Sequence, residues 1–177
     1  MLQAIQYWSL LLLWKSLRLL PYELRRRVLN CLVRLTFILV PRLKRISNLN
    51  LRQAFPDLDQ TARAQIYLDF LGSLATLLAD FTRIPELNRE WVDRNVELDF
   101  LDRLDQVQKH AEGKGILLAT GHLGSFELVA QIAALLEFPI AIIVRRMKHA
   151  RIDRFYNDIR AIHGNQIIYR EGAYREM

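Results

Sequence analysis

The pattern that most constrains the fold is a change near Gly115, after which short apolar runs alternate with stretches of helical length. Three runs have the length of a β-strand, and the two stretches between them repeat apolar residues at helical spacing. In chain order these segments are 116–119, 123–136, 139–144, 151–163 and 166–169. This β-α-β-α-β order predicts a parallel sheet with right-handed crossovers and helices on its faces.

The chain before Gly115 is predicted to be helical. Pro21 and Pro41 divide the first part into two helices, because proline ends a helix at the residue before it. Residues 42–55 predict a third short helix or turn, and a polar helix over 101–111 should end before Gly113. Between them, Asp57 and Asp59 are candidate N-caps for a helix that runs to about Arg83. Its apolar spacing predicts a core-facing stripe of Ile66, Phe70, Leu74, Leu77, Leu78 and Phe81.

The expected fold class is therefore α/β, with N-terminal membrane-associated helices followed by a partial parallel sheet with flanking helices. We assign 1–45 to basic, hydrophobic anchoring helices and 46–177 to the α/β domain. The ending EGAYREM reads as the first turn of a further helix. Three strands would leave a sheet edge and part of an apolar face unused, so we expect a fragment or a shortened gene product.

Charge is distributed unevenly within the net +6. Up to Arg52 there are ten basic residues and one acid, Glu23; residues 53–137 carry seven basic and fourteen acidic residues, and 138–177 carry eight and four. A basic N-terminal arm fits nucleic acid or an anionic membrane. Its basic residues alternate with apolar runs such as YWSLLLLW, to which duplex DNA offers no comparable surface, so a membrane is favoured over nucleic acid.

The N-terminal run is borderline between spanning a membrane and lying in its interface. Residues 1–14 carry no charged side chain, but a spanning helix needs about 20 apolar residues, and Lys15 and Arg18 interrupt the run. The charge follows the apolar core, whereas a signal peptide has it before. Tyr7, Trp8 and Trp14 suit the headgroup boundary. The alternative is a pair of ordinary core helices with solvated arginines.

Cysteine and histidine placement argues against a disulfide or a metal site. Cys31 is the only cysteine and lies in an apolar segment, where a buried, inert thiol on the cytosolic side of a membrane is expected. The histidines are scattered, at His110, His122, His149 and His163. We expect no metal and no cofactor.

The candidate chemistry lies in GILLATGHLGSFELVA, where His122 follows an apolar run and Glu127 comes five residues later. Ligands of parallel sheets gather at the carboxyl ends of strands, where His122 is expected. Five helical steps would put the two about 140° apart, so they can meet only if His122 precedes the helix. A neutral imidazole could then take a proton while the carboxylate fixes its tautomer. The alternative is that His122 merely ends a strand and Glu127 merely favours a helix N-terminus.

The block GHLGSFE resembles the His-x4-Asp/Glu motif of the lysophospholipid acyltransferase superfamily, in the Glu form of the lipid A late (lauroyl/myristoyl) acyltransferases. That family commonly has GHFGNWE, so Leu123, Ser125 and Phe126 depart from its pattern. NLRQAFPDL resembles the segment after the family's anchor. VRRMKHARIDRFYNDIRAIHG resembles its strand ending in Tyr-Arg-Pro, with Arg146 matching the arginine and Arg145 and Met147 replacing its neighbours.

The resemblance implies transfer of a fatty acyl group from acyl carrier protein to a hydroxyl of a membrane glycolipid, at the cytoplasmic side of the inner membrane. His122 would be the general base and Glu127 its orienting partner. Arg146 would bind an anionic group of donor or acceptor, with Arg145 and Lys148 as weaker candidates. Family members continue with further strands and a second site block, so the alternative is a truncated, catalytically incompetent remnant that still binds membrane.

Overall fold

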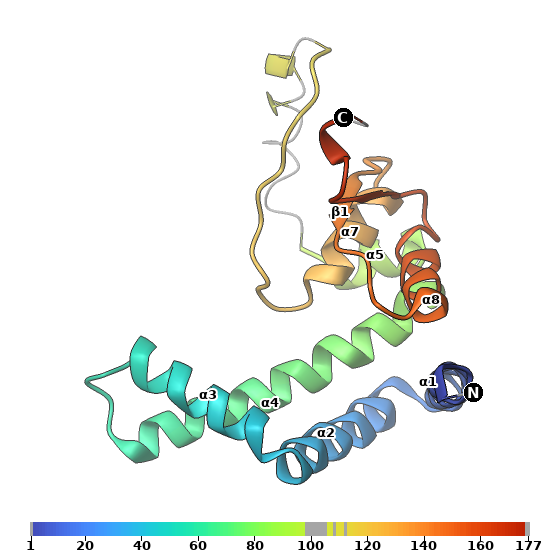
Figure 1. Ribbon diagram of the computed structural model, residues 1–177. Helices are drawn as coiled ribbons and strands as arrows, with labels where there is room; N and C mark the ends of the chain where they lie inside the picture. The colour runs from blue at the N-terminus through green and yellow to red at the C-terminus, as the bar shows by residue number, and fades with distance from the viewer. Residues whose placement is uncertain (1, 98–105, 108, 112, 176–177) are drawn as a thin grey trace.

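The computed structural model describes residues 2–97, 106, 107, 109–111 and 113–175 (Figure 1). It is a mixed α/β fold, mostly helical, with a small parallel sheet near the C-terminus. In chain order the elements are α1 (Leu2–Arg18), α2 (Tyr22–Leu39), α3 (Pro41–Ala54), α4 (Gln60–Arg83), the 3₁₀ turn η1 (Ile84–Glu86), α5 (Arg89–Asn95), α7 (Phe126–Leu135), β1 (Ala141–Val144), α8 (Ala150–Arg160), β2 (Gln166–Tyr169) and the 3₁₀ turn η2 (Ala173–Arg175).

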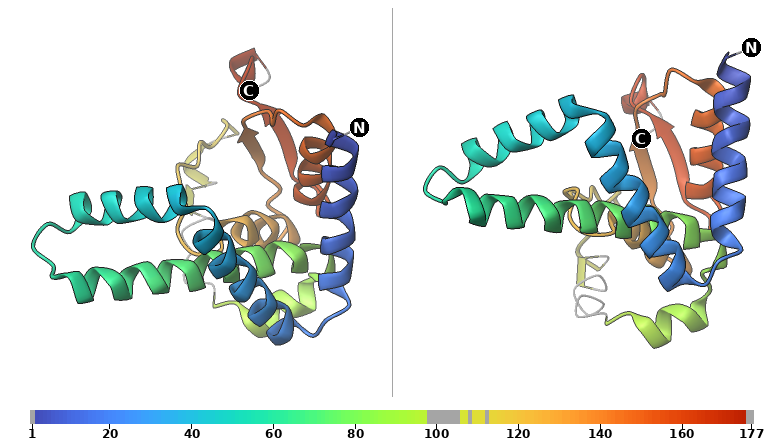
Figure 2. Two further views of the ribbon diagram at one scale, coloured as in Figure 1. Left: turned by 60° about the horizontal axis from the view of Figure 1, so that its bottom comes forward. Right: turned by 90° about the horizontal axis from the view of Figure 1, so that it is seen from below.

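Helices α2, α3 and α4 form an arm that projects away from the sheet (Figures 1 and 2). The predicted breaks at Pro21 and Pro41 are confirmed, and Asp59 caps α4 by accepting a hydrogen bond of 2.8 Å from the backbone N–H of Ala62. The stripe predicted for α4 is partly wrong. Its buried side chains include Leu71, Ala75 and Ala79, four residues apart, whereas Phe70 is exposed. Ala75 and Ala79 lie in the interface between α4 and α2, because their small side chains let the two helices approach closely.

In α2 a stripe at four-residue spacing faces α4 and comprises Arg25, Leu29, Val33 and Phe37. Cys31 is exposed, so the expected buried thiol is wrong. Two steps of 100° from Leu29 turn the Cys31 side chain away from the stripe. Apolar neighbours in sequence do not decide burial when the helix has one packed face.

Helix α1 packs beside α8, far from it in sequence (Figure 2). Trp14 meets Phe155 edge to face at 5.3 Å between ring centroids, and His149 Nε2 donates to the backbone oxygen of Gln3 at 2.6 Å. Of the aromatic residues expected at a headgroup boundary, Trp8 is exposed and Trp14 is part of this internal contact. The proposed boundary at residues 45 and 46 falls inside α3. Among the described residues, no helix has both the length and the apolar character needed to cross a membrane.

Strands β1 and β2 pair in parallel, with Ala141 opposite Gln166 and Val144 opposite Tyr169. The strand predicted over 116–119 is wrong: this run is a loop in which Leu117 is 84% exposed. A strand needs a neighbour to satisfy its backbone groups, and in the described part of the chain the sheet has the order β1-β2. The helix predicted over 101–111 falls largely outside the described residues, although 106, 107 and 109–111 are helical.

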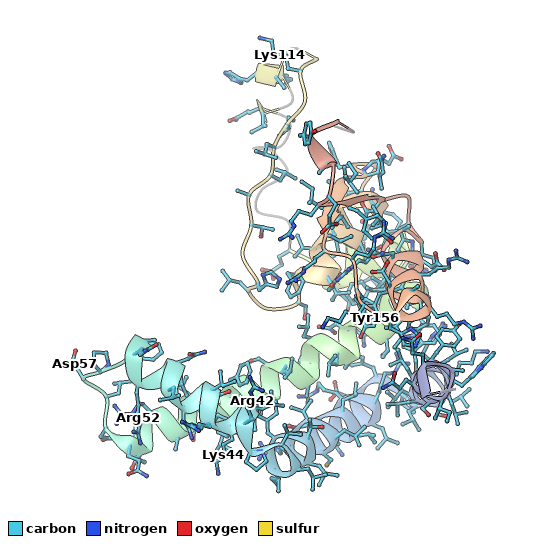
Figure 3. All side chains as sticks on the ribbon, viewed as in Figure 1. Arg42, Lys44, Arg52, Asp57, Lys114 and Tyr156 are labelled. Carbon is cyan, nitrogen blue, oxygen red and sulfur yellow. The ribbon has the colours of Figure 1, made fainter. Side chains whose placement is uncertain are left out.

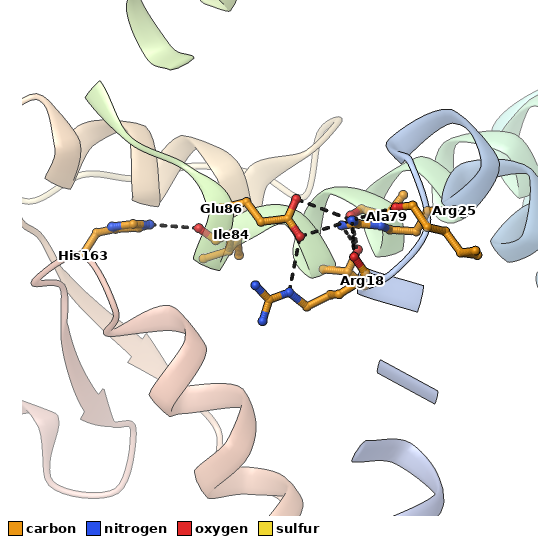
Figure 4. Close-up of polar contacts among 8 residues, drawn as sticks. Arg18, Arg25, Ala79, Ile84, Glu86 and His163 are labelled. Carbon is orange, nitrogen blue, oxygen red and sulfur yellow. Dashed lines mark hydrogen bonds and ion pairs between the residues drawn. The ribbon is translucent and has the colours of Figure 1, made fainter. Parts of the chain in front are cut away.

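The buried guanidinium of Arg25 joins α2 to the end of α4 and to η1 (Figure 4). Its side chain is 3% exposed. Nη1 donates to Thr82 Oγ1 at 3.0 Å, while Nη2 donates to Glu86 Oε1 at 3.1 Å and to the backbone oxygens of Arg18 and Leu20. Arg18 reaches the same Glu86 oxygen at 3.3 Å. The turn between α1 and α2 is thereby fixed to the centre of the molecule.

Replacing Arg25 with alanine should destabilise the fold by about 3 kcal/mol, because the buried Thr82 hydroxyl and the partly buried backbone oxygens of Arg18 and Leu20 lose their donor and a cavity opens. Urea unfolding followed by circular dichroism measures the change. Arg26→Ala is the matched control, since Arg26 lies one residue on and forms an exposed pair with Glu23; its effect should be about 0.5 kcal/mol or less. Equal destabilisation by the two substitutions would contradict the central role of Arg25.

Candidate functional site

His122 lies in the loop before α7, as the sequence required for any meeting with Glu127. The loop ends at Ser125, and α7 begins at Phe126. The imidazole is exposed and stands edge to face against the ring of Phe126, with 4.5 Å between ring centroids. Gly124 has φ of +53°, a left-handed conformation that glycine adopts without strain. His122 is therefore accessible to a substrate.

Glu127 is 9% exposed, in the first turn of α7, and it forms an ion pair with Arg160 at the end of α8. Arg160 Nε donates to Oε2 at 3.0 Å and to Oε1 at 3.2 Å, and Arg160 Nη2 also donates to Oε1. The hydrogen bond to Glu127 raises the pKa of Arg160 above its ordinary value, although burial acts in the opposite direction. The pair holds the start of α7 against the end of α8.

The structure does not bring His122 and Glu127 together by a hydrogen bond. Among the described residues, the hydrogen bonds of the Glu127 carboxylate go to Arg160, and the contact of His122 is with Phe126. A carboxylate has about four lone-pair positions, so Arg160 does not use its full capacity.

The Glu127 carboxylate lies near the end of the sheet at which strands β1 and β2 begin. Asn165, just before β2, accepts from the backbone N–H of Ile140 at 3.0 Å and donates to the backbone oxygen of Ala130 at 3.0 Å. Gln131 donates to the backbone oxygen of Arg160 at 2.9 Å. Because the 116–119 strand is absent from the sheet, it does not carry His122 to the carboxyl edge, where the sequence placed it.

The basic candidates lie at the opposite end, directly after β1. Arg145, Arg146 and Lys148 are all exposed. The Arg146 guanidinium lies over the Tyr169 ring, 3.6 Å from its centroid. Burial acts to raise the pKa of Asp153, but hydrogen bonds from Tyr169 and the Met147 backbone, with Arg146 and Arg160 nearby, lower it overall. Arg146 is thus held at the carboxyl end of β1, with Glu127 toward the other end.

Two residues of this region were missed from the sequence, Asp80 and Arg160. Asp80 is buried in α4 and accepts from the hydroxyls of Ser125 and Tyr22, the latter at 2.6 Å. The Ser125 bond attaches the His122 loop to α4. An acid within the apolar run LLADF is a signal for Asp80 that reading the sequence could have used. Arg160 had no comparable signal, because a basic residue near a helix end is common.

Within the described residues, no three side chains of His, Cys, Asp or Glu are grouped as a metal site would need. What the arrangement offers is an exposed imidazole, a nearby buried carboxylate held by arginine, and basic side chains beyond the sheet.

Tyr22 provides a test of the hydrogen bonds by which Tyr22 and Ser125, in the His122 loop, are joined to Asp80. Burial, followed by its hydrogen bond to Asp80, raises the pKa of Tyr22 from 10.0 to about 12. The folded state therefore favours the neutral phenol, and this contribution to stability is complete below pH 10 and lost as the pH rises to about 12. Tyr22→Phe should remove that part of the pH dependence, measured by urea unfolding at several pH values. Identical pH profiles for the two proteins would contradict the assignment.

Comparison with known proteins identifies the same family that the GHLGSFE motif resembles. The family model described as bacterial lipid A biosynthesis acyltransferase matches residues 1–177. Searches of curated proteins and of solved structures gave no match. The match covers the whole chain, including the GHLGSFE block and the basic segment after β1. The chain therefore belongs to the bacterial lipid A biosynthesis acyltransferase family, and it is an acyltransferase by that membership.

Proposed function

We propose that this chain moves a fatty acyl group from acyl carrier protein to a hydroxyl of a lipid A precursor, at the cytoplasmic side of the inner membrane. The observation that carries the proposal is the family match over residues 1–177. It supports acyl transfer and a lipid-type acceptor. The donor, the mechanism and the location are our inference from the motif and the charge pattern.

His122 is the general base in this proposal. Its neutral imidazole takes the proton of the acceptor hydroxyl as the oxygen attacks the thioester carbonyl. The tetrahedral intermediate then collapses, the C–S bond breaks, and the imidazolium returns its proton to the departing sulfur. The exposure of His122 in the loop before α7 supports this role, since a base must reach its substrate. The acyl thioester is a co-substrate, and no further cofactor is needed.

Glu127 orients the imidazole and stabilises its protonated form. The Arg160 ion pair keeps the carboxylate in place at the start of α7, and unused lone pairs remain for an imidazole N–H. Closure requires a local change in the loop, for which Gly121 and Gly124 supply backbone freedom. In this arrangement Arg160 is a positioning residue for the dyad.

Arg146 binds an anionic group of the donor or acceptor, with Arg145 and Lys148 as weaker contributors. Its exposure and its fixed position over Tyr169 support this role, because a pre-organised guanidinium loses little freedom on binding a phosphate. Arg146 lies beyond β1 and Glu127 near the amino end of the sheet, so a substrate that touches both must be extended. A lipid or an acylated carrier has that shape.

His122→Ala should reduce turnover by about 10²–10⁴-fold, the usual contribution of a general base. Glu127→Gln should also reduce kcat strongly, because the amide neither fixes the tautomer nor stabilises the imidazolium. Acyl transfer from acyl carrier protein to a lipid A precursor is the assay. His110→Ala is the matched control, since His110 is also exposed and lies outside the motif. Near-normal turnover in both motif variants would refute the dyad.

Arg146→Gln should raise KM for the anionic substrate about tenfold or more, with a smaller effect on kcat, because a charge-assisted hydrogen bond is lost. Steady-state kinetics with donor and acceptor varied separately will show which substrate it binds. Arg154→Gln, an exposed arginine on α8, is the control. A fall in kcat at unchanged KM would contradict a binding role.

The second candidate is a non-catalytic, membrane-binding protein. It is favoured by one observation, that the run before His122 is a loop outside the sheet and His122 makes no hydrogen bond with Glu127 among the described contacts. The assay above on the 177-residue chain separates the two. Robust product formation excludes the non-catalytic reading, and absence of product with retained vesicle binding supports it.

A further inference from the structure

We propose that α3 and the groove beside it form a docking surface for an anionic phospholipid bilayer. The docking surface consists of the outward face of α3, with Lys44, Arg45, Leu49 and Arg52, and the groove between α2, α3 and α4. It lies on the arm, away from the sheet; Figure 3 shows Lys44 and Arg52 there. The inference rests on the membrane location proposed above and adds the surface that makes the contact. It does not depend on the chemistry proposed for His122 and Glu127.

Helix α3 has two different faces. Leu43, Ser47 and Leu51 recur every four residues, are partly buried, and lie on its packed side. At 100° per residue, Arg45, Leu49 and Arg52 point away from that side, whereas Lys44 lies about 60° from its centre, at the edge next to the groove. Together with Pro41 and Asn48 they line a shallow surface depression made by α3 alone. Two cations and a leucine thus face outward, and Lys44 completes the lining of the depression from its edge.

In the part of the chain that the structure describes, the cations of this face form no ion pair with an acid. The chain has no acidic residue between Glu23 and Asp57. Among the residues that the structure describes, Lys44, Arg45 and Arg52 form no ion pair, whereas Arg25, Arg26 and Arg160 all do. Their charge is available to an external anion. Each such cation near an anionic bilayer adds about 1 kcal/mol of attraction, which is screened by salt.

An apolar groove continues the charged face. Its lining is mainly apolar, with one cation on each side, and Pro41 and Lys44 belong to both the groove and the outward face. The lining residues are Arg34, Phe37, Ile38, Pro41, Lys44, Tyr67, Leu68 and Leu71. Ile38, Leu39 and Val40 are 71%, 69% and 42% exposed, so consecutive apolar side chains face solvent at this edge of the groove. Lysine and arginine stems with apolar neighbours suit the boundary between headgroups and acyl chains.

A bilayer fits these features better than an acidic protein does. Charge alone would suit either, but the groove adds exposed apolar surface directly beside the cations, and a bilayer offers phosphate and hydrocarbon at adjacent depths. The exposed apolar stripe of α1, with Ile5, Trp8 and Leu12, is the competing membrane contact. It continues into one cation, exposed Lys15, against three on the docking surface, so contact there would depend less on lipid charge.

The test is sedimentation of the 177-residue chain with vesicles of phosphatidylglycerol and phosphatidylcholine, against phosphatidylcholine alone, over a range of salt. Wild-type binding should need phosphatidylglycerol and weaken with salt. Lys44→Gln/Arg45→Gln/Arg52→Gln should weaken it about a hundredfold. Arg89→Gln/Arg94→Gln/Arg154→Gln removes the same charge elsewhere and should change it by about threefold or less, because distant charges are screened. Circular dichroism checks that both variants are folded.

Two more variants separate the alternatives. Ile38→Gln should weaken binding about tenfold if the groove meets lipid, and Trp8→Ser/Leu12→Ser tests α1. The inference is overturned if the α3 triple variant binds like wild type, or if only the α1 variant loses binding. It is also overturned if the chain ignores vesicles but binds acyl carrier protein through the same three cations. His122→Ala should bind vesicles normally, so failure here and failure of the catalytic proposal are distinguishable.

Discussion

The buried Arg25 guanidinium is the interaction on which the arrangement of the other parts depends. It meets the backbone before α2, the end of α4 and the carboxylate of η1 at one point. Two apolar clusters lie on either side of that point: one around Leu29, Val33 and Ala75 in the arm, the other around Phe81, Ile84 and Ile159 beside the sheet. His163 also donates to the backbone oxygen of Ile84 at 2.9 Å. A buried charge with these acceptors sets the direction in which the arm leaves the α/β part.

Local patterns predicted the helices well, because their causes are local. Pro21, Pro41 and the Asp59 cap act within one turn of the chain, and β2 was predicted with its observed bounds. The strand predicted over 116–119 was wrong because a strand needs a neighbouring strand that is distant in sequence, and apolar composition does not specify that neighbour. The predicted burial of Phe70 and Cys31 was wrong for a related reason. The sequence indicates which residues of a helix are apolar, but the helix that packs against it decides how many of them are buried.

The sequence named candidate residues for the site but not their arrangement in space. The spacing correctly required His122 to precede α7, and the roles given to His122, Glu127 and Arg146 stay predictions. What the sequence could not supply was the partner of Glu127. Arg160 is 33 residues away, and only the packing of α7 against α8 brings it to the carboxylate. The ion pair holds Glu127 in place, and in the proposed mechanism the exposed His122 loop moves toward it.

The contact of α1 with α8 has a consequence for synthesis of the chain. The hydrogen bond from His149 to Gln3 spans 146 residues, so α1 leaves the ribosome long before the surface that covers Trp14 exists. At translation rates of about 5–20 residues per second, that interval is roughly 7–30 s. During it the side of α1 that carries Trp14 is uncovered and can meet a chaperone or another surface. The order of synthesis therefore leaves the Trp14 side of α1 open for an interval that the final, packed structure does not reveal.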